Sequence, residues 1–142
     1  MNLIPGIAAS ASALNAERIR MEVVTQNIAN ANTTRDTNGK PYQRQNVVFE
    51  TMLLGAQDSS VGGAVPQGIQ VARIEKDTTE ATPVYDPTHP DADASGYVTY
   101  PNVKIQDEMV DLIASSRAFE ANLAVVKNAR QMAMESLSIA KH

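Results

Sequence analysis

The residues best placed to do chemistry lie together in the stretch VYDPTHPDADASGY, residues 84–97. Asp86, His89, Asp91 and Asp93 fall within eight positions. Carboxylate oxygens and imidazole nitrogens are ligands for divalent metal ions. One interpretation is therefore a metal-binding or metal-dependent module. The spacing does not match an EF-hand, whose loop needs a glycine at position 6 and a glutamate at position 12.

The two prolines of this stretch support a second interpretation. Pro87 and Pro90 fix φ at two places and keep the residues before them extended. Aspartates in such a loop accept hydrogen bonds from nearby backbone N–H groups. On this interpretation the polar side chains shape a rigid turn that faces solvent, and we favour it over a metal site.

The rest of the chain offers no catalytic motif. The sequence has no cysteine, and its second histidine is His142. It also lacks a phosphate-binding glycine loop, the H-E-x-x-H zinc motif and the G-x-S-x-G nucleophile motif. We therefore expect no active site and no cofactor.

Charge and hydrophobicity exclude two classes of partner. The net charge is −4, and lysine and arginine are scattered rather than clustered, which argues against nucleic acid. No run of 18 apolar residues is present, so we expect no membrane span. The first residues, MNLIPGIAASASALNAERIR, lack the basic and apolar regions of a secretory signal.

Composition divides the chain of 142 residues into three segments. Residues 32–103 hold six of the seven prolines and six of the seven glycines, whereas residues 104–142 hold neither. Residues 1–31 are rich in alanine. We predict terminal helices in 1–31 and 104–142 that flank a central region of strands and loops in 32–103.

The C-terminal segment has the pattern of a coiled-coil seam. Apolar residues recur at alternating spacings of three and four over nearly five heptads. Ser116 and Arg130 interrupt the series, and we place them at its solvent edge. The members of the seam are Ile105, Met109, Leu112, Phe119, Leu123, Val126, Ala133, Leu137 and Ala140.

The N-terminal segment repeats the pattern with smaller side chains. Ile7, Leu14, Met21 and Ile28 follow one another at intervals of seven. Because Pro5-Gly6 is a poor helix start, we expect the helix to begin near Ile7. The asparagines that follow, Asn27, Asn30 and Asn32, are expected to end it.

Each terminal segment also has a second apolar row. These rows contain Ile19, Val23 and Val24 in one segment and Val110, Ile113, Val125 and Met134 in the other. One explanation is that neighbouring subunits cover them, so that folding is completed on assembly. The other is an ordinary helical hairpin buried on the central strands of one monomer. The pattern by itself leaves both open.

The central segment predicts short strands at residues 47–54, 69–74 and 97–100. Small and polar residues predict a mobile loop over 55–68. The stretch NIANANTTRDTNGKPY, residues 27–42, is interpreted as helix termination followed by turns, with Asn38-Gly39 as a tight turn.

Four stretches of the chain resemble the flagellar basal-body rod proteins, and among them the C-type proximal rod subunits. They are ASASALNAERIRMEVVTQNIANANTTR (9–35), GKPYQRQNVVFE (39–50), VYDPTHPDADASGYVTYPNV (84–103) and EMVDLIASSRAFEANLAVVKNARQMAMESLSIAK (108–141). The third stretch is similar to the loop that separates C-type subunits from other rod proteins. The residues that carry the family signature are Asn27, Asn30, Asn32, Thr33, Asp86, Pro87, His89, Pro90, Asp91 and Asp93.

The resemblance implies a structural subunit without catalytic activity. It implies a mainly α fold, in which paired coiled-coil-like terminal helices line the inner layer of the proximal rod around the export channel. The central segment would form an outer domain. Implied partners are this chain itself, other rod proteins, the rod-base adaptor, the membrane ring and the flagellar export apparatus, which would export it without a cleaved signal. The heptad residues of both helices would then form the assembly interface, and the second apolar rows would lie between neighbouring subunits.

Overall fold

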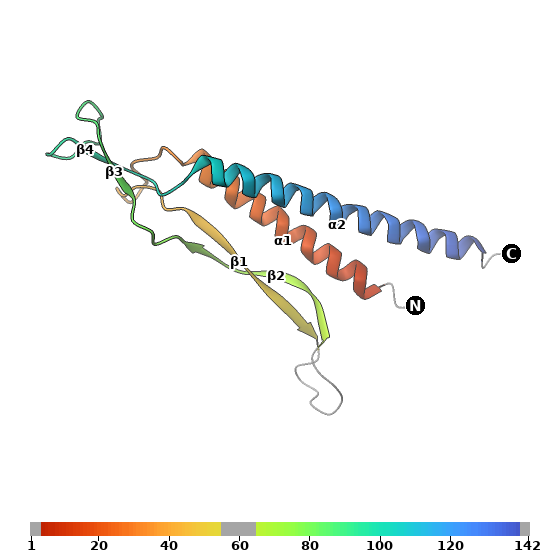
Figure 1. Cartoon of the computed structure of the whole chain (residues 1–142). Helices are drawn as coiled ribbons and strands as arrows, with labels where there is room; N and C mark the ends of the chain where they lie inside the picture. The colour runs from red at the N-terminus through yellow and green to blue at the C-terminus, as the bar shows by residue number, and fades with distance from the viewer. Residues whose placement is uncertain (1–3, 55–64, 140–142) are drawn as a thin grey trace.

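Two long helices dominate the computed structural model, which describes residues 4–54 and 65–139 (Figure 1). Helix α1 spans Ile4–Ala29 and helix α2 spans Ile105–Ile139. They lie side by side and antiparallel, so the start of α1 and the end of α2 are at the same end of the molecule. The predicted fold class, paired terminal helices flanking a small β-rich segment, is confirmed.

The strands form two separate antiparallel sheets of two strands each. Strands β1 (Gln45–Leu54) and β2 (Val65–Lys76) make a long hairpin, and β3 (Thr82–Tyr85) pairs with β4 (Tyr97–Tyr100). The first hairpin runs along α1, whereas β3 and β4 lie beyond the end of the helix pair (Figure 1).

Several sequence-based predictions of helices and strands differ from the structure. Helix α1 begins at Ile4 rather than near Ile7, because a proline fits the first helical turn, where no hydrogen bond from its nitrogen is needed. Strand β2 begins at Val65, inside the predicted loop, and residues 55–64 lie outside the described residues. Strand β3 was not predicted, because its four residues are all exposed and include Pro83, so they show no alternation.

Only half of the predicted seam of α2 faces α1, and residues one position earlier replace the other half. Along α2 the least exposed positions include Glu108, Ser115 and Ala129, each one residue before a predicted seam position. Leu112, Phe119, Val126 and Ala133 are half-buried and complete the row that faces α1. Small side chains on alternate heptad positions allow the helices to approach closely. The predicted row of larger residues is left outside, with Met109 53% exposed and Leu137 67% exposed.

Helix α1 is covered from two sides, because it lies between α2 and the β1–β2 hairpin (Figure 1). Its buried side chains are Ala16, Val23, Val24 and Asn27, and Ala31 is buried in the turn that follows the helix. The prediction that the second apolar row of this helix meets a neighbouring subunit is therefore wrong for Val23 and Val24, which the same chain covers. The corresponding residues of α2 remain exposed, since Val110, Ile113, Val125 and Met134 have no covering element among the described residues.

The hairpin meets α1 most closely at Gly68. A Cβ atom built on Gly68 would lie 2.2 Å from Ser12 Oγ and 3.1 Å from Ser12 Cβ. The same hydroxyl accepts a hydrogen bond from the Ile69 backbone N–H (3.1 Å) and donates one to the Ala9 carbonyl (2.8 Å). The absence of a side chain at Gly68 thus allows the strand to bond directly to the helix.

We predict that Gly68→Val separates this end of the hairpin from α1. The added side chain cannot fit without displacing Ser12, and overpacking of this kind costs about 1–3 kcal/mol. Urea unfolding followed by circular dichroism would measure the loss. Gly6→Ala is the control, because nothing lies within 4 Å of a Cβ at Gly6. Equal stability of the two variants would contradict the close contact.

Candidate functional site

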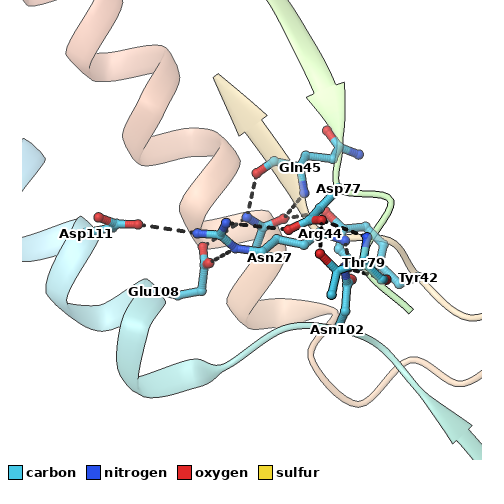
Figure 2. A network of polar contacts seen from close by, with 9 residues as sticks. All are labelled: Asn27, Tyr42, Arg44, Gln45, Asp77, Thr79, Asn102, Glu108 and Asp111. Carbon is cyan, nitrogen blue, oxygen red and sulfur yellow. Dashed lines mark hydrogen bonds and ion pairs between the residues drawn. The ribbon is translucent and has the colours of Figure 1, made fainter. Parts of the chain in front are cut away.

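Asn27 is the centre of a buried polar junction where the helices meet the first hairpin (Figure 2). It lies near the end of α1 and is 1% exposed. Its Nδ2 donates hydrogen bonds to the Gln45 carbonyl (2.9 Å) and to Glu108 Oε2 (2.9 Å). Its Oδ1 accepts from the Tyr42 hydroxyl (2.9 Å) and the Gln45 backbone N–H (2.9 Å). The amide therefore uses both donors and both acceptor sites, which is its full capacity.

Glu108 brings a carboxylate into the same junction from the first turn of α2, and it is 0% exposed. Its Oε1 accepts a short charge-assisted hydrogen bond from Arg44 Nε. A buried carboxylate costs several kcal/mol unless it is paired and hydrogen-bonded. Arg44 and Asn27 together meet that requirement, and they come from two different parts of the chain.

Arg44 extends the junction to two more carboxylates. Its Nη2 lies 3.4 Å from Asp111 Oδ2, and its Nη1 lies 3.9 Å from Asp77 Oδ2. Asp111 also lies 3.5 Å from Arg20 Nη2 on α1. The guanidinium of Arg44 thus connects the start of β1, the end of β2 and the first turns of α2.

Backbone contacts complete the junction. The Arg44 N–H donates to Asn102 Oδ1 (3.0 Å), and Asn102 Nδ2 donates to the Thr79 carbonyl (3.2 Å). The hydroxyl and backbone N–H of Thr79 donate to Asp77 Oδ1 (2.6 and 2.9 Å). These hydrogen bonds, helped by Arg44, lower the pKa of Asp77 and keep it charged.

Tyr42 has the opposite shift. Burial raises the pKa of its hydroxyl, and the negative charges of Glu108 and Asp36 raise it further. The phenol therefore stays protonated and donates its hydrogen to Asn27. Because every group of the junction is occupied by another group of the chain, the arrangement joins elements together and presents no free nucleophile or base.

Sequence reasoning named only Asn27 among these residues, and for another role. Asn27 was expected to end the helix, but it lies inside α1 and bonds to distant segments. Arg44, Asn102, Glu108 and Asp111 were not singled out. One available signal was Glu108 itself, a charged residue one step from a predicted seam position in a long apolar pattern.

The loop of residues 84–97 is built by its aspartates. Asp86 Oδ1 accepts hydrogen bonds from the N–H (3.1 Å) and hydroxyl (2.7 Å) of Thr88. Asp93 Oδ1 accepts from the N–H groups of Ser95 (2.8 Å) and Tyr97 (2.9 Å). The side chains that suggested metal ligands are thus engaged with the backbone around them, as the structural interpretation predicted.

Asp91 and His89 are used differently. Asp91 accepts a hydrogen bond from the Thr34 hydroxyl (2.8 Å) and lies 3.6 Å from Arg35 Nη1, which fastens the loop to the segment after α1. His89 Nδ1 accepts from the Asp91 N–H (3.1 Å), and its ring packs edge-on against Tyr100. Pro87 and Pro90 lie in the same loop and are exposed.

The metal-binding alternative is not supported by this geometry. Among the residues that the structure describes, which include the whole loop, no three His, Asp or Glu side chains converge on a point where a metal ion could bind. Each predicted ligand has instead a partner within the protein.

The asparagines after α1 mostly terminate the helix, as predicted. Asn30 Nδ2 donates to the Gln26 carbonyl (2.9 Å), and Asn30 Oδ1 accepts from the Thr33 hydroxyl (3.2 Å). Asn32 is exposed in the turn that follows. At Gly39, in the predicted tight turn, φ is 72°, a value that glycine adopts readily.

The predicted assembly residues fall into two groups. Those that are half-buried are Ile7, Leu14, Met21 and Ile28 on α1 and Leu112, Phe119 and Val126 on α2. Those that are exposed are Met109, Leu123 and Leu137, all on α2. The apolar side chains of the predicted assembly interface therefore remain partly or largely exposed on the helix pair.

Comparison with protein families defines the class. Residues 7–35 match the model described as flagella basal body rod protein, and residues 94–139 match the model for the C-terminal part of the FlgEFG flagellar basal body rod proteins. These matches cover α1 and its terminating turn, and β4 with α2. The class is that of flagellar basal-body rod proteins.

Curated relatives identify the branch. The chain is 42% identical to the flagellar basal-body rod protein FlgC of Bacillus subtilis, with 99% of this chain and 100% of the relative covered. It is 38% identical to FlgC of Borreliella burgdorferi (98% of each chain) and 35% identical to FlgC of Salmonella typhimurium (90% of each). The chain belongs to the FlgC family of flagellar basal-body rod proteins.

Membership of this family makes the chain a structural subunit of the basal-body rod rather than an enzyme. It is located in the flagellar basal body and interacts with other rod components. Among the described residues, neither helix has an apolar stretch long enough to cross a membrane. The junction and the exposed helix faces are therefore the features that bear on function.

We predict that Asn27→Ala weakens the fold far more than Asn30→Ala. The first change leaves the Gln45 N–H and one Glu108 oxygen without a partner, at about 1–3 kcal/mol for each buried group. The second removes only local bonds at the exposed end of the helix. Denaturant titrations of both variants would measure the difference, and similar midpoints would show that the junction carries little stability.

We also predict that Thr88→Val raises the pKa of Asp86 toward its ordinary value of about 3.9. Hydrogen bonds from Thr88 are the main cause that lowers this pKa. A lowered pKa in the folded loop means that Asp86 stabilises the loop fully above pH about 4. This contribution disappears as the pH falls through the folded pKa. Carboxyl chemical shifts in an NMR titration would test this, with Thr79→Val as a control that leaves Asp86 unchanged.

Proposed function

We propose that this subunit polymerises through its terminal helices into the proximal rod, the part of the drive shaft that surrounds the flagellar export channel. Residues 1–31 and 104–142 would form its inner layer, and residues 32–103 its outer part. The proposal goes beyond family membership, and one observation carries it: most large apolar side chains of α2 are exposed.

Two exposed rows run along α2 on either side of its contact with α1. One contains Val125, Met132 and Ile139 at intervals of seven residues. The other contains Met109, Ile113, Leu123 and Met134. Exposed large apolar side chains gathered on one helix in this number point to a site of protein–protein contact.

The position of the rows supports lateral packing of helices. Each row lies beside the intramolecular contact, so a neighbouring helix could occupy the groove on either flank of the pair. On α1 the half-buried residues Ile7, Leu14, Met21 and Ile28 would take part in the same grooves. The helix pair would then be one unit of a wall of helices.

The partners follow from this role. We propose contacts with copies of this chain, other proximal rod subunits, the rod-base adaptor and the membrane-ring protein. The flagellar export apparatus would deliver the chain, largely unfolded, without a cleaved signal. The described apolar core consists only of valines and alanines. Such a small core is consistent with a chain that folds only after export.

We predict that Val125→Asp abolishes rod assembly and motility without unfolding the monomer. Val125 is 51% exposed, and a substitution at such a site changes the free energy of unfolding by about 0.5 kcal/mol or less. In an assembled rod the new charge would be buried without a partner. Purified basal bodies examined by electron microscopy, together with circular dichroism of the monomer, provide the two measurements.

Asn38→Asp is the control, because it adds the same charge at an exposed position in the turn after α1, away from both rows of α2. Leu123→Asp tests the second row and Ile28→Asp tests α1 in the same assay. Normal rods that contain the Val125→Asp and Leu123→Asp proteins would contradict the proposed packing.

A further inference from the structure

The C-terminal end of α2 extends past its partner helix. Counting equal numbers of residues along both antiparallel helices from the Asn27–Glu108 contact places Ile4 opposite Gln131. Met132–Ile139 thus lie beyond the described part of α1, and every side chain of residues 134–139 is exposed. We call this end, together with the last turn of α2 that still lies opposite α1, the overhang (residues 127–139).

The overhang combines apolar and basic side chains. Met134 and Leu137 are 61% and 67% exposed. Lys127, Arg130 and Met134 line a shallow surface groove together with Gln131, Glu135 and Ser138. The one acidic group of the groove, Glu135, accepts a hydrogen bond from Gln131 (3.0 Å). The groove therefore suits an occupant with apolar and negatively charged groups.

The opposite end of the same molecule has that chemistry. Figure 1 shows the β3–β4 sheet at the far end from the overhang. Residues 77–100 carry five carboxylates and no lysine or arginine. Tyr85 and Tyr97 pack edge to face with ring centres 5.3 Å apart, and they remain 64% and 46% exposed.

The acidic character of this end is only partly neutralised within the chain. Asp77 and Asp91 lie within ion-pair distance of Arg44 and Arg35. Within the described ranges, Glu80, Asp86 and Asp93 have no such cation. Two exposed tyrosines beside unneutralised carboxylates thus complement methionine and leucine beside lysine and arginine.

We propose that the overhang of one copy docks on the β3–β4 end of a second copy, head to tail. Met134 and Leu137 would contact Tyr85 and Tyr97, and the basic groups would face the loop carboxylates. Because the two surfaces differ and lie at opposite ends, the contact is heterologous and can repeat along an open assembly. The inference rests on the proposed function and adds an axial contact to its lateral one.

Chemical cross-linking of the full chain tests this contact. The sequence has no cysteine, so a single introduced thiol is the only reactive one. Ala94→Cys lies in the β3–β4 loop and Ser138→Cys in the overhang, and both positions are exposed. A short bis-maleimide added to a concentrated mixture of the two variants should give mainly the mixed dimer.

Asn15→Cys is the control for this experiment, since Asn15 is exposed near the middle of α1, away from both ends. We expect its yield with Ser138→Cys to be at least about tenfold lower than that of the mixed pair. Equal yields, or no product from the Ala94→Cys and Ser138→Cys pair, would overturn the inference.

A charge exchange tests the electrostatic part. Ser95→Lys adds a positive charge to the acidic end without removing a loop hydrogen bond, because Ser95 donates through its backbone N–H, and Arg130→Glu reverses a charge in the groove. On the matching cysteine backgrounds, each change alone should lower the cross-linking yield by about fivefold, the upper range for an exposed ion pair. Both changes together should restore it, and failure of this rescue would contradict the predicted pairing.

Experiments in cells separate this inference from the proposed function. If Ser95→Lys and Arg130→Glu leave rods intact while Val125→Asp abolishes them, the head-to-tail contact is wrong and lateral packing stands. If the Val125→Asp protein also builds normal rods, both are wrong. Loss of rods with either charge variant, and recovery with both, would support the axial contact.

Discussion

The architecture depends on how one buried negative charge is partnered. Glu108 has no solvent exposure, and its carboxylate is balanced by Arg44 from the start of the first hairpin and by Asn27 from α1. Desolvation makes an unpaired carboxylate at this point so unfavourable that all three segments must be in place together. The position of the hairpin against the helix pair therefore depends on the first turn of α2, which carries Glu108.

This polar junction matters more because the apolar core is thin. In the described chain the fully buried apolar residues are alanines and valines, while methionines, leucines and isoleucines of α2 lie at the surface. Each buried alanine removes little area from water, so packing alone stabilises the monomer weakly. The same distribution leaves the strongest hydrophobic groups free for contacts between subunits, which suits a protein that is functional only within an assembly.

The loop that resembled a metal site shows how one residue type serves two purposes. Aspartate is both a good ligand for hard cations and a good acceptor for backbone N–H groups in turns. The prolines hold the chain so that Asp86 and Asp93 reach N–H groups two to four residues ahead. The loop thereby becomes a preformed end of the molecule, fastened to the segment after α1 through Asp91.

Periodicity and composition alone determined the two terminal helices, strand-forming segments within β1 and β2, and the structural character of the acidic loop, whereas the pairing of the helices was implied only by the family resemblance. These features depend on local spacing, on proline and glycine, and on the heptad pattern, all of which are local properties of the chain. Tertiary structure decided which row of α2 faces α1, because packing selects the row with Ser115 and Ala129 although the row one residue later carries larger apolar side chains. It also decided the role of Asn27, Arg44 and Glu108, since hydrogen bonds between residues up to 81 positions apart leave no periodic trace in the sequence.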